Sequence, residues 1–256
     1  MNLHQRFLTE NNCYKAGKRH TVRGIMVHST GANNPRLSRY VGPDDGILGE
    51  NKNGNHWNTP NPGGIPICVH AFIGKDKNGV IRTYQTLPWD MVGWHSGIGA
   101  LGFTKNANNT GYVGFEICED DLAGVTYFNI VYKEAVELCA MLCQKYKLDP
   151  IKDIICHSEG HRLGIASNHA DVMHWFPRHG KSMDDFRKAV AKALVENKKP
   201  EAVQPKPDVK PEPVQPAAQG KRYSVQAGAF STRVNAETLL IKVRSAGFVD
   251  AYITED

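Results

Sequence analysis

The chain has 256 residues, of which 41% are hydrophobic and 22% are charged, and its formal net charge is +5. This composition excludes a wholly disordered or collagen-like chain and is sufficient for a hydrophobic core, and the length fits one or two domains. The longest apolar runs have the size of a β-strand. None approaches the ~20 residues of a membrane-spanning helix, so we expect no membrane insertion.

The excess of positive charge is mild and is not gathered in a dense cluster of lysine and arginine, so we predict no nucleic-acid partner. The same charge suits a protein that approaches an anionic polymer such as a cell wall. The N-terminus has no apolar stretch of the kind found in a secretory signal. We therefore expect the protein to be made and kept in the cytoplasm. We also expect its six cysteines, none of which forms a CxxC pair, to be free thiols.

In chain order, the first part of the sequence alternates strands and helices. Strands are predicted over residues 24–29, 67–74, 80–85, 112–118 and 154–156. Asn78-Gly79 between the second and third strands is typical of a hairpin. The Gly-, Asn- and Pro-rich segment 41–66 is long enough to predict a functional or mobile loop. Apolar residues at helical spacing predict a helix over 129–148.

The sequence predicts that the first part ends as a domain and is followed by a linker and a small second unit. Ser182 and Asp185 have the spacing of a capping box for a helix that ends near Leu194, which closes a first domain over residues 1–196. Residues 197–221 are rich in Pro, Lys and Glu and cannot bury enough surface to offset ordering entropy, so we predict a linker. A small βαβ unit is then predicted over residues 222–256, a size that rarely folds alone.

Candidate metal ligands lie near or after the ends of two predicted strands. His28 lies near the end of the first strand, where a structural histidine is the alternative to a ligand. His157 follows the last strand. Further candidate ligands downstream are His161, His169 and Asp171. Two histidines and one carboxylate with an open fourth position are typical of a catalytic zinc site, whereas a polar surface loop is the alternative.

Glu116 lies inside an otherwise apolar strand, where a carboxylate is costly unless it is paired or functional. Burial raises the pKa of such a group toward neutrality, which suits a general base, and a buried ion pair is the alternative. Cys118 shares its face and is a second candidate ligand, or a packed thiol. A cysteine hydrolase that uses Cys118 or Cys156 also remains open.

Five motifs follow one another within residues 22–177. They are Val27-His28-Ser-Thr30, Val69-His70-Ala-Phe72 with its hairpin, Gly93-Trp94-His95-Ser-Gly97, Gly114-Phe-Glu116-Ile117, and the segment from Cys156-His157 to His169-Ala-Asp171. In this order they resemble the zinc-dependent N-acetylmuramoyl-L-alanine amidases, which are related to peptidoglycan recognition proteins and include many phage endolysins. The resemblance implies an α/β fold with a central mixed β-sheet flanked by helices.

The resemblance also implies the site. Zn²⁺ would be held by His28, His157 and Asp171. Glu116 would be the catalytic base, and His169, which stands where the family often has a lysine, would be the second catalytic residue. Candidates to line the groove for the glycopeptide are Trp57, His70, His95 and Trp175. For the two tryptophans, hydrophobic packing is the alternative.

Two positions depart from the family pattern. The spacing from His157 to Asp171 is longer than is common, which leaves His161 as a competing ligand. Val69 stands where a tyrosine is common. The implied reaction is hydrolysis of the amide between N-acetylmuramic acid and L-alanine in bacterial peptidoglycan. A recognition protein that binds without cleaving is the alternative, although such a protein would not need all three ligands and Glu116.

The missing export signal favours a phage or prophage endolysin, held in the host cytoplasm until it is released to the cell wall, over a host autolysin. The C-terminal unit resembles a SPOR-type repeat, a module that binds cell-wall glycan strands. The likeness is carried by Tyr223-Ser-Val225-Gln-Ala-Gly228-Ala-Phe230 and Ala246-Gly247-Phe248. The family fold pairs two βαβ halves and only one is present, so we expect a homodimer through this unit.

Overall fold

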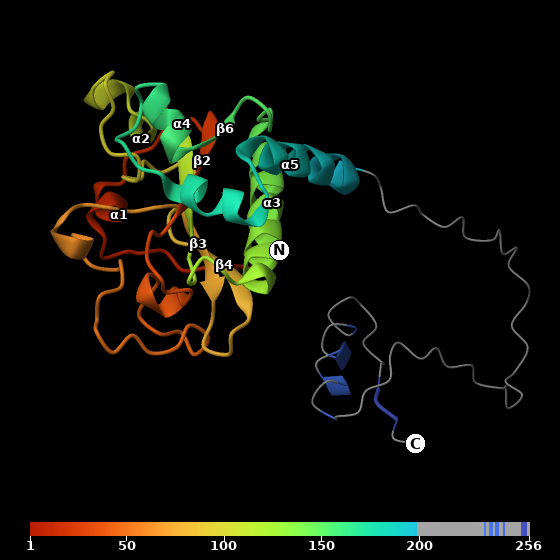
Figure 1. Ribbon diagram of the computed structural model, residues 1–256. Coiled ribbons are helices and arrows are strands. Elements are labelled where there is room, and N and C mark those ends of the chain that lie inside the picture. The colour runs from red at the N-terminus through yellow and green to blue at the C-terminus, as the bar shows by residue number, and fades with distance from the viewer. Residues whose placement is uncertain (199–232, 234–235, 238, 241–242, 244–251, 255–256) are drawn as a thin grey trace, which may run out of the picture. The chain divides into compact units, whose positions relative to one another are not determined.

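The computed structural model describes residues 1–198 and, further on, residues 233, 236–237, 239–240, 243 and 252–254 (Figure 1). The chain divides into two units, Met1–Val203 and Gln204–Asp256. The first unit is built on a six-stranded β-sheet. Among the described helices, none combines the length and the hydrophobicity that crossing a bilayer requires.

The sheet is mixed, as predicted, and its strand order is β1-β4-β3-β5-β2-β6. The strands are β1 (Leu3–Gln5), β2 (Gly24–Ser29), β3 (Ala71–Lys75), β4 (Ile81–Gln85), β5 (Tyr112–Ile117) and β6 (Ile154–Cys156). Only the β3–β4 hairpin is antiparallel, and the other four pairs are parallel. The carboxyl ends of β5, β2 and β6 therefore meet at one edge of the sheet.

Helices flank this sheet (Figure 1). The described α-helices are α1 (Asn12–Ala16), α2 (Ala107–Thr110), α3 (Val125–Tyr146), α4 (His157–Arg162) and α5 (Met183–Lys198). Short 3₁₀ helices are η1 (Leu37–Arg39), η2 (Pro62–Gly64), η3 (Phe103–Lys105), η4 (Asp171–His174) and η5 (Phe176–His179). Helices α3 and α5 pack against each other, and both contact the sheet.

Alternation along the strands decides which side chains form the main core. Val27 of β2, with Phe115 and Ile117 of β5, is fully buried in the same apolar cluster as the inner side of α3 and α5. His28 and Glu116 occupy the intervening positions, so their side chains leave the sheet on its opposite face. A histidine and a carboxylate are thereby kept out of the main core and held at the carboxyl edge of the sheet.

The predicted strands are all present, although β3 begins four residues later than predicted. β2 and β6 have the predicted bounds, and the predicted hairpin is present with Gly79 at a φ of 79°. Helix α3 begins four residues earlier than predicted. The capping box before α5 is formed, because Asp185 N–H donates to Ser182 Oγ at 3.1 Å and Ser182 N–H to Asp185 Oδ2 at 2.9 Å. Both predicted helices are confirmed.

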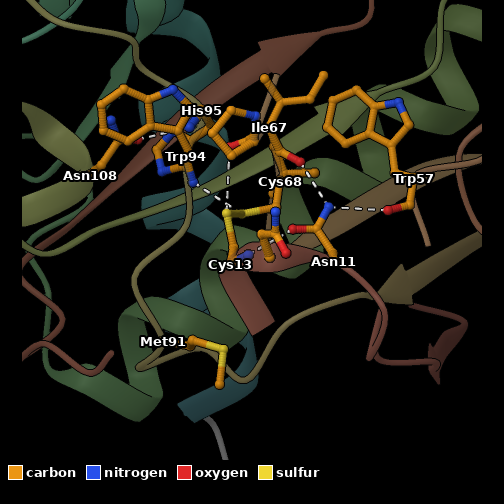
Figure 2. Close-up of a disulfide and its surroundings, with 12 residues drawn as sticks. Asn11, Cys13, Trp57, Ile67, Cys68, Met91, Trp94, His95 and Asn108 are labelled. Carbon is orange, nitrogen blue, oxygen red and sulfur yellow. Dashed lines mark hydrogen bonds between the residues drawn. A yellow bond between two sulfur atoms is a disulfide. The ribbon is translucent and has the colours of Figure 1, made fainter. Parts of the chain in front are cut away.

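One prediction about the cysteines is wrong. Cys13 and Cys68 form a disulfide (Figure 2), whereas the other four cysteines are free and buried. Asn11, before α1, brings the pair together. Its side-chain amide donates to the carbonyl oxygens of Trp57 at 3.1 Å and Ile67 at 3.0 Å, and its carbonyl oxygen accepts from Cys13 N–H at 2.9 Å. The disulfide and these hydrogen bonds thereby fasten the N-terminal segment to the segment that precedes β3.

Little of the second unit is described. The described residues between positions 233 and 243 are helical, in agreement with a helix in the middle of the predicted βαβ unit. Residues 252–254 lie outside helix and strand. Residues 197–198, predicted as the start of the linker, still belong to α5. The rest of the linker, most of the predicted βαβ unit and the surface of the predicted homodimer lie outside the described residues.

Candidate metal centre and active site

The site is assembled from the carboxyl ends of three neighbouring strands. His28 near the end of β2 is paired in register with Glu116 of β5. On the other side of β2, Val27 is paired with Cys156, and His157 follows as the first residue of α4. Cys156 is buried in the main core, so the chain turns between it and His157, whose ring lies beside that of His28 with centroids 5.0 Å apart.

Asp171 completes a group of three donors. The Nδ1 atoms of His28 and His157 are 3.2 Å apart. Asp171 Oδ1 lies 3.6 Å from His28 Nδ1, and Asp171 Oδ2 lies 3.0 Å from His157 Nδ1. The three side chains are only 1%, 2% and 9% exposed, respectively. The donor atoms of these three side chains thus converge on one position, and the side chains themselves are largely shielded from solvent.

This geometry fits a zinc ion. Ligand atoms ~2.0–2.1 Å from a tetrahedral zinc ion lie ~3.3 Å apart, close to the separations observed here. Burial lowers the pKa of His28 despite the opposing effect of Asp171, so its ring is neutral near neutral pH and can offer a lone pair. Two imidazoles and one carboxylate also form a donor set that is common in catalytic zinc sites.

The backbone at Asp171 is unusual. Its φ is 46°, in the left-handed region that few residues other than glycine adopt, and Asp is among those that tolerate it. The residue begins η4, which packs against β2. A sparsely populated backbone conformation at a candidate ligand is the kind of strain that functional sites hold. Here it directs the carboxylate toward the two histidines.

Glu116 stands beside this group with an unpaired oxygen. Its Oε2 atom is buried and has no hydrogen-bond partner among the described residues. Burial raises the pKa of Glu116 well above its ordinary value, and the charges of Asp171 and Glu119 raise it further. Glu116 also lines a cavity of about 640 Å³ together with the three donors. A carboxyl group is therefore available to a molecule bound there.

The predicted groove residues separate into two groups. Trp57, His95 and His169 line the cavity, and the ring of His169 lies against that of His157 with centroids 4.7 Å apart. His70 and Trp175 are fully buried. Contact with a substrate is therefore not supported for these two.

The buried pair has structural contacts instead. His70 Nε2–H donates to Met91 O at 2.7 Å, and His70 Nδ1 accepts from Gly114 N–H at 3.1 Å. Burial lowers the pKa of His70 to about 4, so it stays neutral and joins β5 to the segment before His95. Trp175 packs its ring on Phe128 of α3 with centroids 5.5 Å apart, which is the packing alternative raised for it.

The competing ligands lie elsewhere. His161 is exposed at the end of α4, and its Nδ1 atom lies 3.3 Å from Ala166 O. Cys118 is fully buried in a second apolar cluster with Phe72 and Tyr84. Neither belongs to the group of three donors that the described residues form. The longer spacing between His157 and Asp171 is taken up by the turn after α4.

The prediction missed a further pair at the cavity. His174 lines it, and its Nε2 atom lies 2.9 Å from Oε1 of Glu119, which is 3% exposed. The same oxygen accepts from Gly31 N–H at 3.1 Å, so Glu119 joins the loop after β2 to η4. The sequence spacing could have indicated this pair. His174 follows Asp171 by one helical turn, and Glu119 lies two residues beyond the end of β5, the strand that carries Glu116.

Comparisons with known proteins bear on the family and the fold of the chain. Residues 219–256 match the SPOR domain. No curated protein sequence shows significant similarity to this chain. The fold is similar to that of the Staphylococcus aureus hydrolase AmiA in complex with its ligand, with a TM-score of 0.50 and 18% identity over 77% of this chain and 83% of that one. The fold is also similar to that of a mutant form of PlyL, with a TM-score of 0.50 and 16% identity over 75% of this chain and 99% of that one.

Both likenesses concern the fold alone. Membership follows from the sequence itself, because residues 18–177 match the family described as N-acetylmuramoyl-L-alanine amidase, Amidase_2. The match covers more than half of the chain and includes His28, Glu116, His157 and Asp171. The chain therefore belongs to the Amidase_2 family of N-acetylmuramoyl-L-alanine amidases.

Proposed function

We propose that this protein is a zinc-dependent hydrolase that cleaves the amide bond between N-acetylmuramic acid and L-alanine in bacterial peptidoglycan. The observation that carries the proposal is the convergence of His28, His157 and Asp171 beside the unpaired Oε2 atom of Glu116 in one cavity. Zinc held by His28, His157 and Asp171 would polarise the scissile carbonyl group and acidify a water molecule.

Glu116 is the group we assign to proton transfer. Its free Oε2 atom can accept the proton of the attacking water and return it to the amine that leaves with L-alanine. No buried hydrogen bond has to be broken first, because this oxygen has no partner among the described residues. The partly buried position keeps the carboxyl group in place between the two transfers.

His169 is the second group that we assign to the reaction. It is exposed on the cavity wall, and its ring lies against that of His157. From there a ring N–H can donate a hydrogen bond to the carbonyl oxygen as negative charge develops on it. Trp57 and His95, which line the same cavity, would contact the glycopeptide.

We further propose that the SPOR-matching segment binds the glycan strands and keeps the amidase at the wall. A weak binding module joined to a catalytic domain raises the local concentration of substrate without new contacts at the active site. We also propose that a phage or prophage uses this activity as an endolysin. The resemblance of the sequence to a family that includes many phage endolysins supports this.

The test is digestion of purified peptidoglycan by the full chain, with and without EDTA, followed by identification of the new ends. We expect free amino groups of L-alanine, no new reducing sugars, loss of the reaction in EDTA and its return with added zinc. New reducing sugars or full activity in EDTA would contradict the proposal. Binding to the walls without any new amino groups would favour the recognition protein.

A further inference from the structure

Both histidines of the candidate metal centre use their second ring nitrogen in a hydrogen bond. The Nε2 atom of His28 lies 3.0 Å from Nδ1 of His95. The Nε2 atom of His95 in turn lies 3.2 Å from the carbonyl oxygen of Tyr112. A chain of hydrogen bonds therefore runs from a ligand, through a second imidazole, to the backbone of β5.

The carbonyl oxygen of Tyr112, the last acceptor, determines which nitrogen carries each proton in this series of hydrogen bonds. A carbonyl oxygen only accepts, so Nε2 of His95 must carry a proton. A neutral imidazole carries one proton, and Nδ1 of His95 is then an acceptor. The proton between the two rings consequently belongs to Nε2 of His28. That leaves Nδ1 of His28, which faces His157 and Asp171, with a free lone pair.

The second histidine ligand has a parallel arrangement. His157 Nε2 lies 3.2 Å from Ser167 Oγ, and the Ser167 hydroxyl donates to the carbonyl oxygen of Ser96 at 3.2 Å. With its only proton used in that bond, Ser167 Oγ accepts from His157 Nε2–H. His157 Nδ1 is therefore also left unprotonated. The two series of hydrogen bonds therefore fix the same tautomer, with the proton on Nε2, at both histidine ligands.

Both series of hydrogen bonds involve one short segment, residues 95–96. The first includes the ring of His95, and the second ends at the carbonyl oxygen of Ser96. Asn108 of α2 is fully buried, and its Oδ1 atom accepts from His95 N–H at 2.8 Å and Ser96 N–H at 3.0 Å. Figure 2 shows Asn108 beside His95. The ring of His95 also requires Gly114, because a Cβ atom there would come within 2.4 Å of His95 Nδ1.

We propose that His95 and Ser167 are positioning residues, which hold the two histidine ligands in the tautomer and orientation that zinc requires, and that Asn108 holds His95 in place. This inference rests on the zinc site of the proposed function. Hydrogen-bond partners of this kind fix ring orientation and raise ligand basicity, and their loss typically weakens metal affinity ~10–100-fold.

Zinc affinity, measured by competition with a chelator in the full chain, tests this first. We expect His95→Phe to bind zinc ~10–100-fold more weakly, and His95→Gln, which keeps an acceptor, to lose less. Ser167→Ala, at the partly exposed end of the second chain of hydrogen bonds, should weaken binding in the same direction. His161→Phe is the matched control and should keep the affinity of the parent chain. Circular dichroism of each variant shows whether it folds.

The outcomes separate the two proposals. If the parent chain binds no zinc, the proposed function fails and this inference fails with it. If the parent binds zinc and folded His95→Phe and Ser167→Ala variants bind it equally well, only the positioning role is overturned. Should His95→Phe not fold, Ser167→Ala decides.

Nuclear magnetic resonance of the zinc-loaded parent chain, labelled with ¹⁵N-histidine, gives a readout that a merely structural role would not predict. We expect the His28 ring proton to be bonded to Nε2, to exchange slowly with solvent and to show scalar coupling across the hydrogen bond to His95 Nδ1. A proton bonded to His95 Nδ1, or one that exchanges as fast as that of exposed His161, would overturn the inference.

Discussion

His28 and Glu116 lie opposite each other on the neighbouring parallel strands β2 and β5. Their side chains therefore leave the sheet on the same face, one as a proposed zinc ligand and the other as the proposed base. Because each is held by its own strand, a substitution that keeps the shape of Glu116 should leave the ligand in place. Metal binding and proton transfer can thus be separated by experiment.

Glu116→Gln is predicted to bind zinc like the parent chain but to release L-alanine amino groups from peptidoglycan at least ~10²-fold more slowly, because the amide cannot accept the proton of the attacking water. Metal analysis and an end-group assay on the same preparation check both parts. Glutamine keeps the size of the side chain, so a folded variant is expected. Lysis at the parent's rate would remove Glu116 from the role of base.

Loss of any one ligand should deplete the metal. His28→Ala, His157→Ala and Asp171→Ala each leave two donors, and we expect the purified variants to contain little zinc by elemental analysis and to show no activity. His161→Ala is the control, because His161 lies outside the group of three and should leave the zinc content unchanged. A variant that keeps a full equivalent of zinc would show that its residue is not a ligand.

The strands and the grouping of the ligands could be predicted because they depend on local patterns. Apolar alternation marks β2 and β5, and parallel strands bring residues at their carboxyl ends to one edge. His28, Glu116 and His157 follow from that rule. The left-handed backbone at Asp171 and the hydrogen bond from His28 to His95 depend on tertiary geometry, which no local pattern contains.

Two of the interpretations that the structure does not support share a physical reason. The motif places His70 in the groove, yet its ring is buried and hydrogen-bonded to Met91 and Gly114. Cys13 and Cys68 were expected to be free, yet Asn11 joins two segments that are far apart in sequence. In both cases long-range contacts, which composition and spacing do not reveal, decide the outcome.

Glu159 and Arg187 form a pair whose contribution to stability should depend on pH. Arg187 donates to both carboxylate oxygens at 3.0 Å, and Glu159 Oε2 also accepts from Cys156 N–H at 3.0 Å. The side chains are 18% and 13% exposed. Burial alone would raise the pKa of Glu159, but these hydrogen bonds outweigh it and lower the pKa below the ordinary value of 4.5.

A depressed folded-state pKa means that the stabilisation is present above the unfolded-state pKa and is lost as the pH falls. Glu159→Gln should therefore lower the free energy of unfolding by about 1.5–3 kcal/mol near neutral pH, and by progressively less below pH 4.5. Denaturant unfolding at several pH values measures this. Asp184→Asn, which removes the 75% exposed partner of the same arginine, is the control and should cost no more than ~1 kcal/mol. A loss that does not change with pH would contradict the assignment.

The disulfide between Cys13 and Cys68 should stabilise the chain by about 2–4 kcal/mol, because it closes a loop between residues 55 positions apart and so restricts the unfolded state. Thiol titration of the unfolded, unreduced protein should count the four free cysteines, against all six after reduction. In denaturant unfolding, Cys13→Ser should be less stable than the parent by this amount. Reductant should lower the stability of the parent to that of the variant but leave the variant unchanged. Six thiols before reduction, or an equal effect of reductant on both chains, would contradict the bond.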